Sequence, residues 1–450
     1  FITHRAVCRL PKFSSRPKDK RMHIIVVGGG IIGATTAYAC LRRGHEVTLL
    51  EAGDALAGGT SYANGGQIAV SESAPWSQPG LPMKMLARSW RADAPFRLRL
   101  RADPTQWRWL FAFLANSRAG PHHAGRMRNL ALGRYSLACL QRTRAELGND
   151  FTYDDAQKGI LQLVPTGASI DLDHIRDQRA RGVPVSWLGP EEIAAVEPAL
   201  TSAVEDGLFA GAVWGKADES GDAHLFAQRL VGAFPRARFS QYCNMAVTRI
   251  ISSNGQVQGV LSAERRFDAD AVIVAAGVHT RDLLAPLGVK LPIYGVKGYS
   301  ITVPLDKGAP APEISLTDLK NRLVVSRLGD RLRVAGFAEI GARADIAPAR
   351  VAAMRARVGE FFPDMSLADD VSPWVGFRPM TPDGTPLVGP VPDIAGLYVN
   401  SGHGPLGWTF SHGAAQIIAD LASGIKPEID IEGLSVTRAT AQLFLRRGAT

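Results

Sequence analysis

The chain has 450 residues, of which 46% are hydrophobic and 21% charged, and this composition is typical of a globular protein with two domains. The net charge is +9, but residues 1–21 contribute seven basic side chains against one Asp, which leaves only +3 for the other 429 residues. The sequence has no basic stripe with stacking aromatics, which argues against nucleic-acid binding, and no apolar stretch approaches the length of a membrane span.

The first 21 residues form a basic leader that ends just before the first apolar run. Pro11 and Pro17 interrupt any long amphipathic helix, so we expect a disordered leader, with an organelle transit peptide as the alternative. The four cysteines are scattered without C-x-x-C spacing. We therefore expect no metal site, and a reducing, cytoplasmic location.

The first predicted element is a strand–turn–helix unit with a glycine-rich turn. The apolar run 24–27 predicts a strand, and a helix is expected from Ala34 to about Arg43, stopped by Gly44. A helix that begins inside such a turn points free N–H groups and a partial positive charge at phosphates, which predicts an adenine dinucleotide. The turn has G-x-G-x-x-G spacing and consists of Gly28, Gly29, Gly30, Ile31, Ile32 and Gly33.

The second predicted strand, 47–51, ends on an acid. Glu51 stands 18 residues after Gly33. Its carboxylate can accept hydrogen bonds from both ribose hydroxyls and would repel a 2′-phosphate. No second G-x-G-x-x-G occurs, which argues against a separate site for a pyridine nucleotide.

Two unusual segments follow. Residues 57–67 are rich in Gly, Ser and Asn, and such a loop can wrap a large ligand through its backbone. Residues 84–108 carry seven basic side chains against two acidic ones, and the overlapping run 107–114 places apolar residues at i, i+3, i+4 and i+7. We expect this apolar helix to pack in a core, with contact to an anionic bilayer surface as the alternative.

The rest of the chain alternates predicted helices and strands. The small residues Ala276 and Gly277, which end one of these strands, would let it pass beneath an adenine. The turn Asn254-Gly255 predicts a hairpin. Helices are expected over 126–148, 170–182, 190–197, 222–234 and 348–361, and strands over 159–164, 246–251, 257–262, 266–274, 299–303, 322–326 and 331–336.

A second group of constrained residues lies toward the C-terminus. Prolines flank Arg378 in a turn-rich segment, and a guanidinium held in this way can bind a carboxylate; a surface arginine beside a turn is the alternative. Another Gly-rich turn, 402–407, follows a predicted strand and precedes a helix. A helix N-terminus there would stabilise the negative charge of a reduced flavin ring.

Together these motifs resemble the FAD-dependent D-amino acid dehydrogenases, within the D-amino-acid-oxidase and glycine-oxidase superfamily. The resemblance covers Met22 to about Arg438 in family order and rests on the first glycine turn, on 60–68, 297–300 and 378–389, and on 402–408. It implies an α/β protein with a discontinuous Rossmann-type FAD-binding domain and an α+β substrate domain built on an antiparallel sheet. The implied boundaries are 22–75, 215–290 and 373–435 for the FAD-binding domain, and 76–214 and 291–372 for the substrate domain.

The resemblance also implies roles for single residues. Arg378 is expected to bind the substrate carboxylate, and Tyr299 to line the substrate pocket, with a structural tyrosine as the alternative. His403 is expected to position the flavin or its loop, not to act as a general base. His279 stands where the superfamily often has an aromatic residue. The residues expected to bind FAD are Gly28, Gly30, Ile31, Ile32, Gly33, Glu51, Ala52, Ser61, Asn64, Gly66, Gln67, Val247, Ala276, Gly277, Gly404, Leu406, Gly407, Trp408 and Thr409.

The implied reaction is oxidative deamination of a D-amino acid. Hydride transfer to flavin N5 gives an imino acid, which water hydrolyses to a 2-oxo acid and ammonia. Electrons are expected to pass to a quinone or electron-transfer partner, with 84–114 docking on the inner face of the cytoplasmic membrane. The alternatives are a D-proline or D-hydroxyproline dehydrogenase subunit, an amine oxidase using dioxygen, and a non-catalytic nucleotide-binding subunit.

Overall fold

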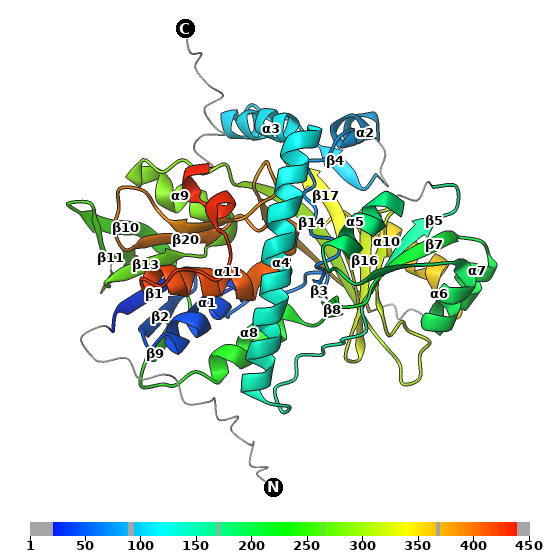
Figure 1. The fold of residues 1–450 in the computed structure, drawn as a ribbon, viewed down its shortest axis with the longest axis horizontal. Helices are drawn as coiled ribbons and strands as arrows, with labels where there is room; N and C mark the ends of the chain where they lie inside the picture. Colours follow the sequence, from blue (N-terminus) through cyan, green and yellow to red (C-terminus); the bar gives the residue numbers. More distant parts are fainter. Residues whose placement is uncertain (1–20, 89–93, 169–171, 264, 366–369, 439–450) are drawn as a thin grey trace.

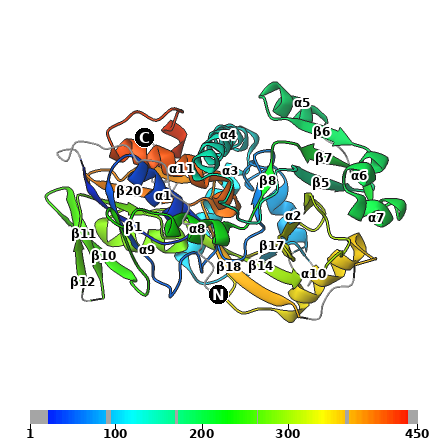
Figure 2. The same cartoon turned by 90° about the horizontal axis from the view of Figure 1, so that it is seen from below.

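The computed structural model describes residues 21–88, 94–168, 172–263, 265–365 and 370–438. A six-stranded sheet and a larger nine-stranded sheet lie side by side, and the long helix α4 (Ala119–Leu147) runs across the face where they meet (Figures 1 and 2). Of the predicted leader only Arg21 is described, and its Nη1 lies 3.4 Å from Oε1 of Glu46.

The six-stranded sheet has the order β19-β20-β13-β1-β2-β9, and its strands are parallel except for β19. Helix α1 packs against α8 and α11 to form the layer on one face. The elements are β1 (His23–Val27), β2 (Glu46–Leu50), β9 (Phe239–Tyr242), β13 (Ala271–Val274), β19 (Leu387–Pro390), β20 (Leu397–Ser401), α1 (Ile31–Arg42), α8 (Ala223–Gly232) and α11 (Gly407–Ala422).

A three-stranded antiparallel meander covers the opposite face of this sheet, and the two share one apolar core. Its strands are β10 (Val247–Ser253), β11 (Gln256–Ser262) and β12 (Arg265–Asp268), with the predicted hairpin turn at Asn254-Gly255. The single strand predicted over 266–274 is two strands. The chain leaves the meander after β12, and β13 pairs with β1 in the parallel sheet.

The nine-stranded sheet is mainly antiparallel, with the order β18-β14-β17-β16-β15-β5-β7-β6 and β4 paired to β17. The strand β18, which carries Arg378, pairs with β14, so residues 373–380 belong to the nine-stranded sheet. The strands are β4 (Phe96–Leu98), β5 (Ile160–Pro165), β6 (Val185–Leu188), β7 (Phe209–Gly215), β14 (Tyr294–Pro304), β15 (Ser315–Asp318), β16 (Leu323–Leu328), β17 (Arg331–Ile340) and β18 (Ser372–Met380).

The remaining elements cover the sheets or link them. The predicted helix 170–182 begins at Leu172, and its first two predicted residues lie outside the described residues. These elements are β3 (Gln67–Ile68), β8 (Glu219–Ser220), α2 (Leu81–Arg88), α3 (Pro104–Asn116), α5 (Leu172–Ala180), α6 (Pro190–Val196), α7 (Thr201–Glu205), α9 (Thr280–Leu284), α10 (Pro348–Phe361) and the 3₁₀ turns Pro198–Leu200, Gly277–His279, Ala285–Leu287, Gly404–Leu406 and Glu432–Leu434.

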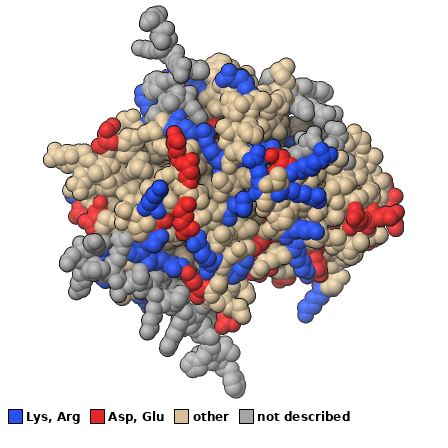
Figure 3. All heavy atoms as spheres, viewed as in Figure 1, with Lys and Arg blue, Asp and Glu red and all other residues tan. Residues whose placement is uncertain are grey.

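Basic side chains gather along the middle of the face that α4 crosses (Figure 3). Two arginines of α4 form ion pairs with neighbouring elements: Arg126 with Asp177 on α5 at 2.5 Å, and Arg144 with Glu219 on β8 at 2.7 Å. These charges therefore help to hold α4 against the elements on its flanks.

Helix α3 is apolar on two sides. Trp109 and Phe113 are buried against α2 and the nine-stranded sheet, with their rings stacked at 5.2 Å. Of the stripe that the sequence predicts to be buried, Leu110 packs partly against this core, whereas Trp107, Phe111 and Leu114 face outward and are 40%, 56% and 49% exposed. Apolar residues occur on both sides of this helix, so the spacing of apolar residues in the sequence does not decide which side is buried.

Candidate active site

The first glycine turn has the close packing that its spacing predicts. Gly28 has φ +107°, which a residue with a side chain rarely adopts. A Cβ at Gly33 would overlap the carbonyl oxygen of Gly28, so α1 can begin this close to β1 only with glycine there. A Cβ at Gly28 would in turn overlap Ala275 and press on Ala276 at the end of β13. The backbone of the turn is therefore packed against the start of α1 on one side and against the end of β13 on the other.

Glu51 and the loop 57–67 adjoin this turn. Glu51 accepts hydrogen bonds from the N–H groups of Gly29 at 2.6 Å and Gly53 at 2.8 Å. Ser61 accepts one from the N–H of Ile31 at 3.0 Å. Asn64 accepts one from the N–H of Gly66 at 2.9 Å, and the carbonyl of Gly65 accepts one from Ser326 on β16. The loop therefore connects the nucleotide-type turn to the nine-stranded sheet.

The other residues that the sequence assigns to FAD lie at the edges of these segments. Ala52 is exposed next to Glu51, and Val247 begins β10, close to where the N–H of Met245 donates to the carbonyl of Glu51. The Gln67 side chain is occupied by Ser315 and Thr317 on β15, and the Trp408 ring is buried among aromatic residues. Gly277 has φ +54°, and Thr409 accepts from the N–H of Ala69 at 3.0 Å.

The second glycine turn meets β18 two residues beyond Arg378. His403 forms an antiparallel bridge with Met380, and Gly404, Leu406 and Gly407 lead into α11. The hydroxyl of Thr60 donates to the carbonyl of Phe377 at 3.0 Å. The loop 57–67 and the turn 402–407, two glycine-rich segments more than 300 residues apart in the chain, therefore both contact the strand that carries Arg378.

Arg378 lies across the nine-stranded sheet without an acidic partner among the described residues. Its guanidinium passes over Gly298, where a Cβ would lie 2.6 Å from Cζ. Its Nη1 and Nη2 donate to the carbonyls of Phe337 at 2.8 Å and Gly336 at 3.3 Å. Burial lowers the pKa of Arg378 to about 10, which leaves it positively charged at neutral pH. A partly buried cation with only neutral partners can bind an incoming anion strongly.

Aromatic side chains that sequence reasoning missed lie on the same side of the sheet as Arg378. The Trp76 ring centroid lies 5.5 Å from Cζ, and the Trp374 ring covers Gly376 on the same face of the sheet. Tyr62 stands 6.4 Å from Trp374, ring to ring. Ser300, also on this face, has a buried hydroxyl with no hydrogen-bond partner among the described residues. The signal available was the Pro-rich segment around Trp76, but nothing local ties it to Arg378.

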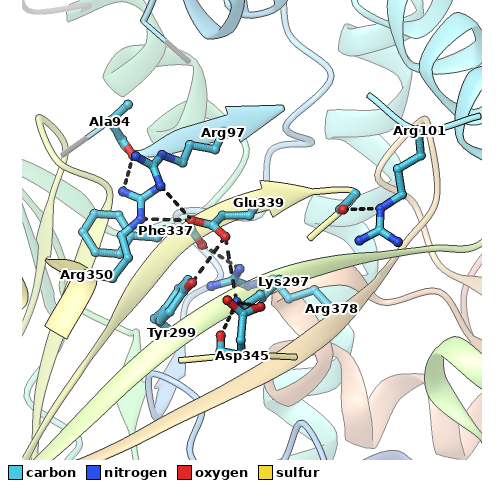
Figure 4. A network of polar contacts seen from close by, with 11 residues as sticks. Ala94, Arg97, Arg101, Lys297, Tyr299, Phe337, Glu339, Asp345, Arg350 and Arg378 are labelled. Carbon is cyan, nitrogen blue, oxygen red and sulfur yellow. Dashed lines mark hydrogen bonds and ion pairs between the residues drawn. The ribbon is translucent and has the colours of Figure 1, made fainter. Parts of the chain in front are cut away.

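Tyr299 is not brought to Arg378. Residues of a strand alternate between faces, and Arg378 lies on the face of Gly298, so Tyr299 points to the opposite face (Figure 4). It is 2% exposed, and its hydroxyl donates to Glu339 at 3.3 Å. This arrangement matches the alternative of a structural tyrosine.

His403 is buried, and its Nε2 has no hydrogen-bond partner among the described residues. Burial lowers its pKa to about 3, so the imidazole is neutral at neutral pH. A neutral, buried ring with one unsatisfied nitrogen can hold a polar group in place but lacks the basicity of an ordinary histidine. His279 is exposed on the 3₁₀ turn after β13.

Comparison with known proteins identifies this arrangement. The family model described as FAD dependent oxidoreductase matches residues 23–421. The chain belongs to the FAD-dependent oxidoreductases. Among curated proteins, the D-amino acid dehydrogenase of Bradyrhizobium diazoefficiens is 37% identical, covering 93% of this chain and 99% of that protein. The D-amino acid dehydrogenase of Cereibacter sphaeroides is 40% identical over 93% of this chain and 96% of its own length.

Solved structures with the same fold include two amine-oxidising enzymes. Glycine oxidase from Geobacillus kaustophilus superimposes with a TM-score of 0.71 at 24% identity, over 93% of this chain and 99% of that one. L-proline dehydrogenase from P. horikoshii superimposes with a TM-score of 0.69 at 17% identity, over 94% of this chain and 98% of that one. The predicted combination of a Rossmann-type FAD-binding domain and a second domain on an antiparallel sheet is confirmed.

The residues present fit FAD, the cofactor of this oxidoreductase family. The glycine turn leaves no room for side chains and points the N-terminus of α1 outward, as a pyrophosphate requires. The buried Nε2 of His403 stands at the start of the second glycine turn, where a bound group would satisfy it. Among the described residues, no group of three or more His, Cys, Asp or Glu is placed to hold a metal ion.

A second buried histidine gives a pH-dependent prediction. His412 on α11 is buried, which lowers its pKa to about 3, whereas an unfolded histidine titrates near pH 6.5. The unfolded chain therefore binds a proton that the folded protein excludes, so stability is lost as pH falls below 6.5. The variant His412→Asn lacks this loss. The unfolding free energy of wild type minus that of the variant should therefore fall by about 2 kcal/mol from pH 6.5 to pH 5.

Urea unfolding of both proteins across this pH range measures the difference, because terms shared by the two proteins cancel. Replacement of the exposed His279 by asparagine is the matched control and should leave the pH dependence unchanged. An equal pH dependence in His412→Asn and wild type would contradict the buried, neutral state of His412.

Proposed function

We propose that the protein is an FAD-dependent D-amino acid dehydrogenase. A D-amino acid and water give a 2-oxo acid and ammonia, while two electrons pass to an acceptor. Curated relatives of this name are 37% and 40% identical over 93% of the chain. The observation that carries the proposal is Arg378, a partly buried guanidinium without an acidic partner among the described residues, placed where both glycine-rich segments meet β18.

FAD supplies the two-electron oxidant for this reaction when it is bound. We propose that Gly28, Gly30, Gly33 and the N-terminus of α1 hold its pyrophosphate and that Glu51 accepts from its ribose. Ser61, Asn64, Gly66 and the segment 404–409 hold the rest of the cofactor. The proposed FAD-binding domain comprises 22–75, 215–290 and the residues after β18 up to 435, and the proposed substrate domain takes the remaining segments, β18 included.

The chain's own residues orient the substrate. Arg378 binds the carboxylate through its planar fork, which fixes the direction of the α-carbon and sets which enantiomer reacts. Trp76 lies against the guanidinium and shields one side of it from water. His403 is neutral at neutral pH and positions a polar group without taking the amine proton, so the amine must arrive deprotonated.

Anaerobic mixing tests the reaction. Purified flavin-loaded protein is mixed with D- and L-amino acids, glycine and D-proline while the flavin absorbance is followed. Bleaching by D- but not L-amino acids is the expected result, and slow recovery of colour in air would separate a dehydrogenase from an oxidase. Preferential bleaching by glycine or D-proline would move the assignment to a glycine-oxidase-like enzyme or a D-proline dehydrogenase. Absence of bleaching by every amine would contradict the proposal.

For the electron acceptor we propose a membrane quinone, reached by docking of α2 and α3 on an anionic bilayer. No helix in the described part of the chain is long and apolar enough to cross a membrane. The outward stripe of α3 consists of Trp107, Phe111 and Leu114, and Leu100 and Met83 in the preceding segments are exposed as well. Arginines 99, 101, 108 and 118, in the same stretch of the chain, are exposed too. Exposed aromatic side chains together with cations suit the interface of an anionic membrane.

Vesicle sedimentation measures this docking. Flavin-loaded protein should bind vesicles that contain anionic lipid more tightly than purely zwitterionic ones. The double variant Trp107→Gln/Phe111→Gln should weaken binding about tenfold or more, since each exposed aromatic buries apolar area at the interface. Ile346→Gln, which removes an exposed apolar residue elsewhere, is the control. Equal binding of the double variant and wild type would contradict the docking surface.

A further inference from the structure

The two carbonyls that hold Arg378 belong to a bulge in β17. Lys297 on β14 pairs with Glu339, but Tyr299, two residues on, pairs with Gly336, so the register shifts between them. Phe337 lies inside the shift with φ +51°. The bulge presents the carbonyls of Gly336 and Phe337 to the guanidinium. The direction of Arg378 therefore depends on the backbone conformation of Phe337.

That conformation is unfavourable for a bulky side chain, so the surrounding structure must hold it. The Phe337 ring is buried on the face of the sheet opposite to Arg378 (Figure 4). The Arg350 guanidinium lies 4.3 Å from the ring centroid, and the Tyr299 ring meets it edge-on at 6.2 Å. These two side chains enclose the ring and oppose any change in the bulge.

Glu339 holds both Arg350 and Tyr299 in place. Its Oε1 accepts from Nε of Arg350 at 3.0 Å, and its Oε2 accepts from the Tyr299 hydroxyl at 3.3 Å. Nη1 of Arg350 also donates to the carbonyl of Ala94 at 2.6 Å. Arg350, Glu339 and Tyr299 are 0%, 1% and 2% exposed. A buried, charge-assisted cluster of this kind holds its members in one geometry.

We infer that Phe337 is a positioning residue for substrate binding, held by Glu339, Arg350 and Tyr299, and that this cluster sets the direction of the Arg378 guanidinium. The inference rests on the proposed binding of the substrate carboxylate by Arg378 and extends it to residues that never touch the substrate. The inference also assigns a role to Tyr299. Because Tyr299 lies on the face away from Arg378, it acts on Arg378 only through Phe337.

Two variants test the inference in the flavin-loaded protein. Phe337→Leu keeps apolar volume but removes the ring, and Tyr299→Phe removes only the hydroxyl that Glu339 accepts. We expect KM for a D-amino acid to rise about tenfold in Phe337→Leu and about threefold in Tyr299→Phe, with kcat changed less than twofold, as loss of orientation of one charged group predicts. Phe209→Leu, which removes a buried ring of β7 in the same sheet, is the control and should leave KM unchanged.

Binding of the 2-oxo acid product gives a readout without turnover. Trp76 lies 5.5 Å from Arg378, so tryptophan fluorescence can report the dissociation constant. We expect this constant to rise by the same factors as KM. In an Arg378→Met background both effects should vanish, because the cluster has no guanidinium left to direct.

The outcomes separate the inference from the proposed function. If Arg378→Met alone leaves KM and product binding unchanged, the carboxylate site is wrong, whatever Phe337 does. If Arg378→Met weakens binding but Phe337→Leu and Tyr299→Phe do not, the positioning role is wrong and the proposed function stands. Effects of the two variants that persist undiminished in the Arg378→Met background would likewise show a general structural role and overturn the inference.

Discussion

Replacing Arg378 with methionine should raise KM for a D-amino acid by about two to four orders of magnitude, because removal of one partner of a buried charge pair costs about 3–5 kcal/mol. The guanidinium has only the carbonyls of Gly336 and Phe337 as hydrogen-bond partners among the described residues, so an incoming carboxylate meets an uncompensated charge. Methionine keeps apolar contact with Trp76 but has no donor. Steady-state KM and kcat with an artificial electron acceptor measure the effect.

Two further variants sharpen this result. Arg378→Lys keeps the charge but loses the planar fork, and its KM should fall between those of wild type and the methionine variant. Arg327→Met removes an exposed arginine of β16 in the same sheet and should leave KM unchanged. The flavin content of all three should equal that of wild type. A wild-type KM in folded, flavin-loaded Arg378→Met would rule out Arg378 as the carboxylate site.

The nucleotide-type half of the molecule was predictable because local demands determine it. A tight turn between β1 and α1 needs a residue with positive φ at Gly28 and no side chain at Gly33, and both demands are visible as glycines at fixed spacing. The helix begins at Ile31, earlier than the predicted Ala34, because the turn itself already has helical geometry. The Asn254-Gly255 hairpin was predictable for the same local reason.

The surroundings of Arg378 were less predictable than Arg378 itself, because they depend on strand pairings between distant segments. Alternation along β14 places neighbouring residues on opposite faces, but it does not say which face meets the glycine turns. The pairing of Val296 with Arg378, 82 residues away, decides this and places Tyr299 on the far face. The sequence motif 297–300 therefore lies on the strand that pairs with β18, but its tyrosine lies on the face away from Arg378. Trp374 shares β18 with Arg378, whereas Trp76 reaches Arg378 only through the tertiary fold.

The second large effect expected is loss of FAD from Gly33→Ala. The new Cβ would overlap the carbonyl oxygen of Gly28, and neither backbone can move without separating α1 from β1. Such overpacking costs about 1–3 kcal/mol even where side chains can adjust, and here the obstacle is main chain. Separation of the helix from the turn also moves the N-terminus of α1 away from a pyrophosphate. The purified variant should be colourless, with less than about a tenth of the wild-type flavin absorbance per chain, as a loss of more than 1.4 kcal/mol in binding predicts at limiting FAD.

The matched control is Gly359→Ala in α10. A Cβ at Gly359 has no neighbouring atom within 4 Å, and alanine favours a helix more than glycine does. This variant should keep its full flavin content and unfold at the same or a slightly higher temperature than wild type. The flavin content of Gly33→Ala should recover only partly when excess FAD is added, because the obstacle is the position of the helix and not the supply of cofactor. A yellow Gly33→Ala protein with wild-type FAD affinity would show that the pyrophosphate does not depend on this contact between α1 and β1, and the cofactor would then have to be placed elsewhere on the six-stranded sheet.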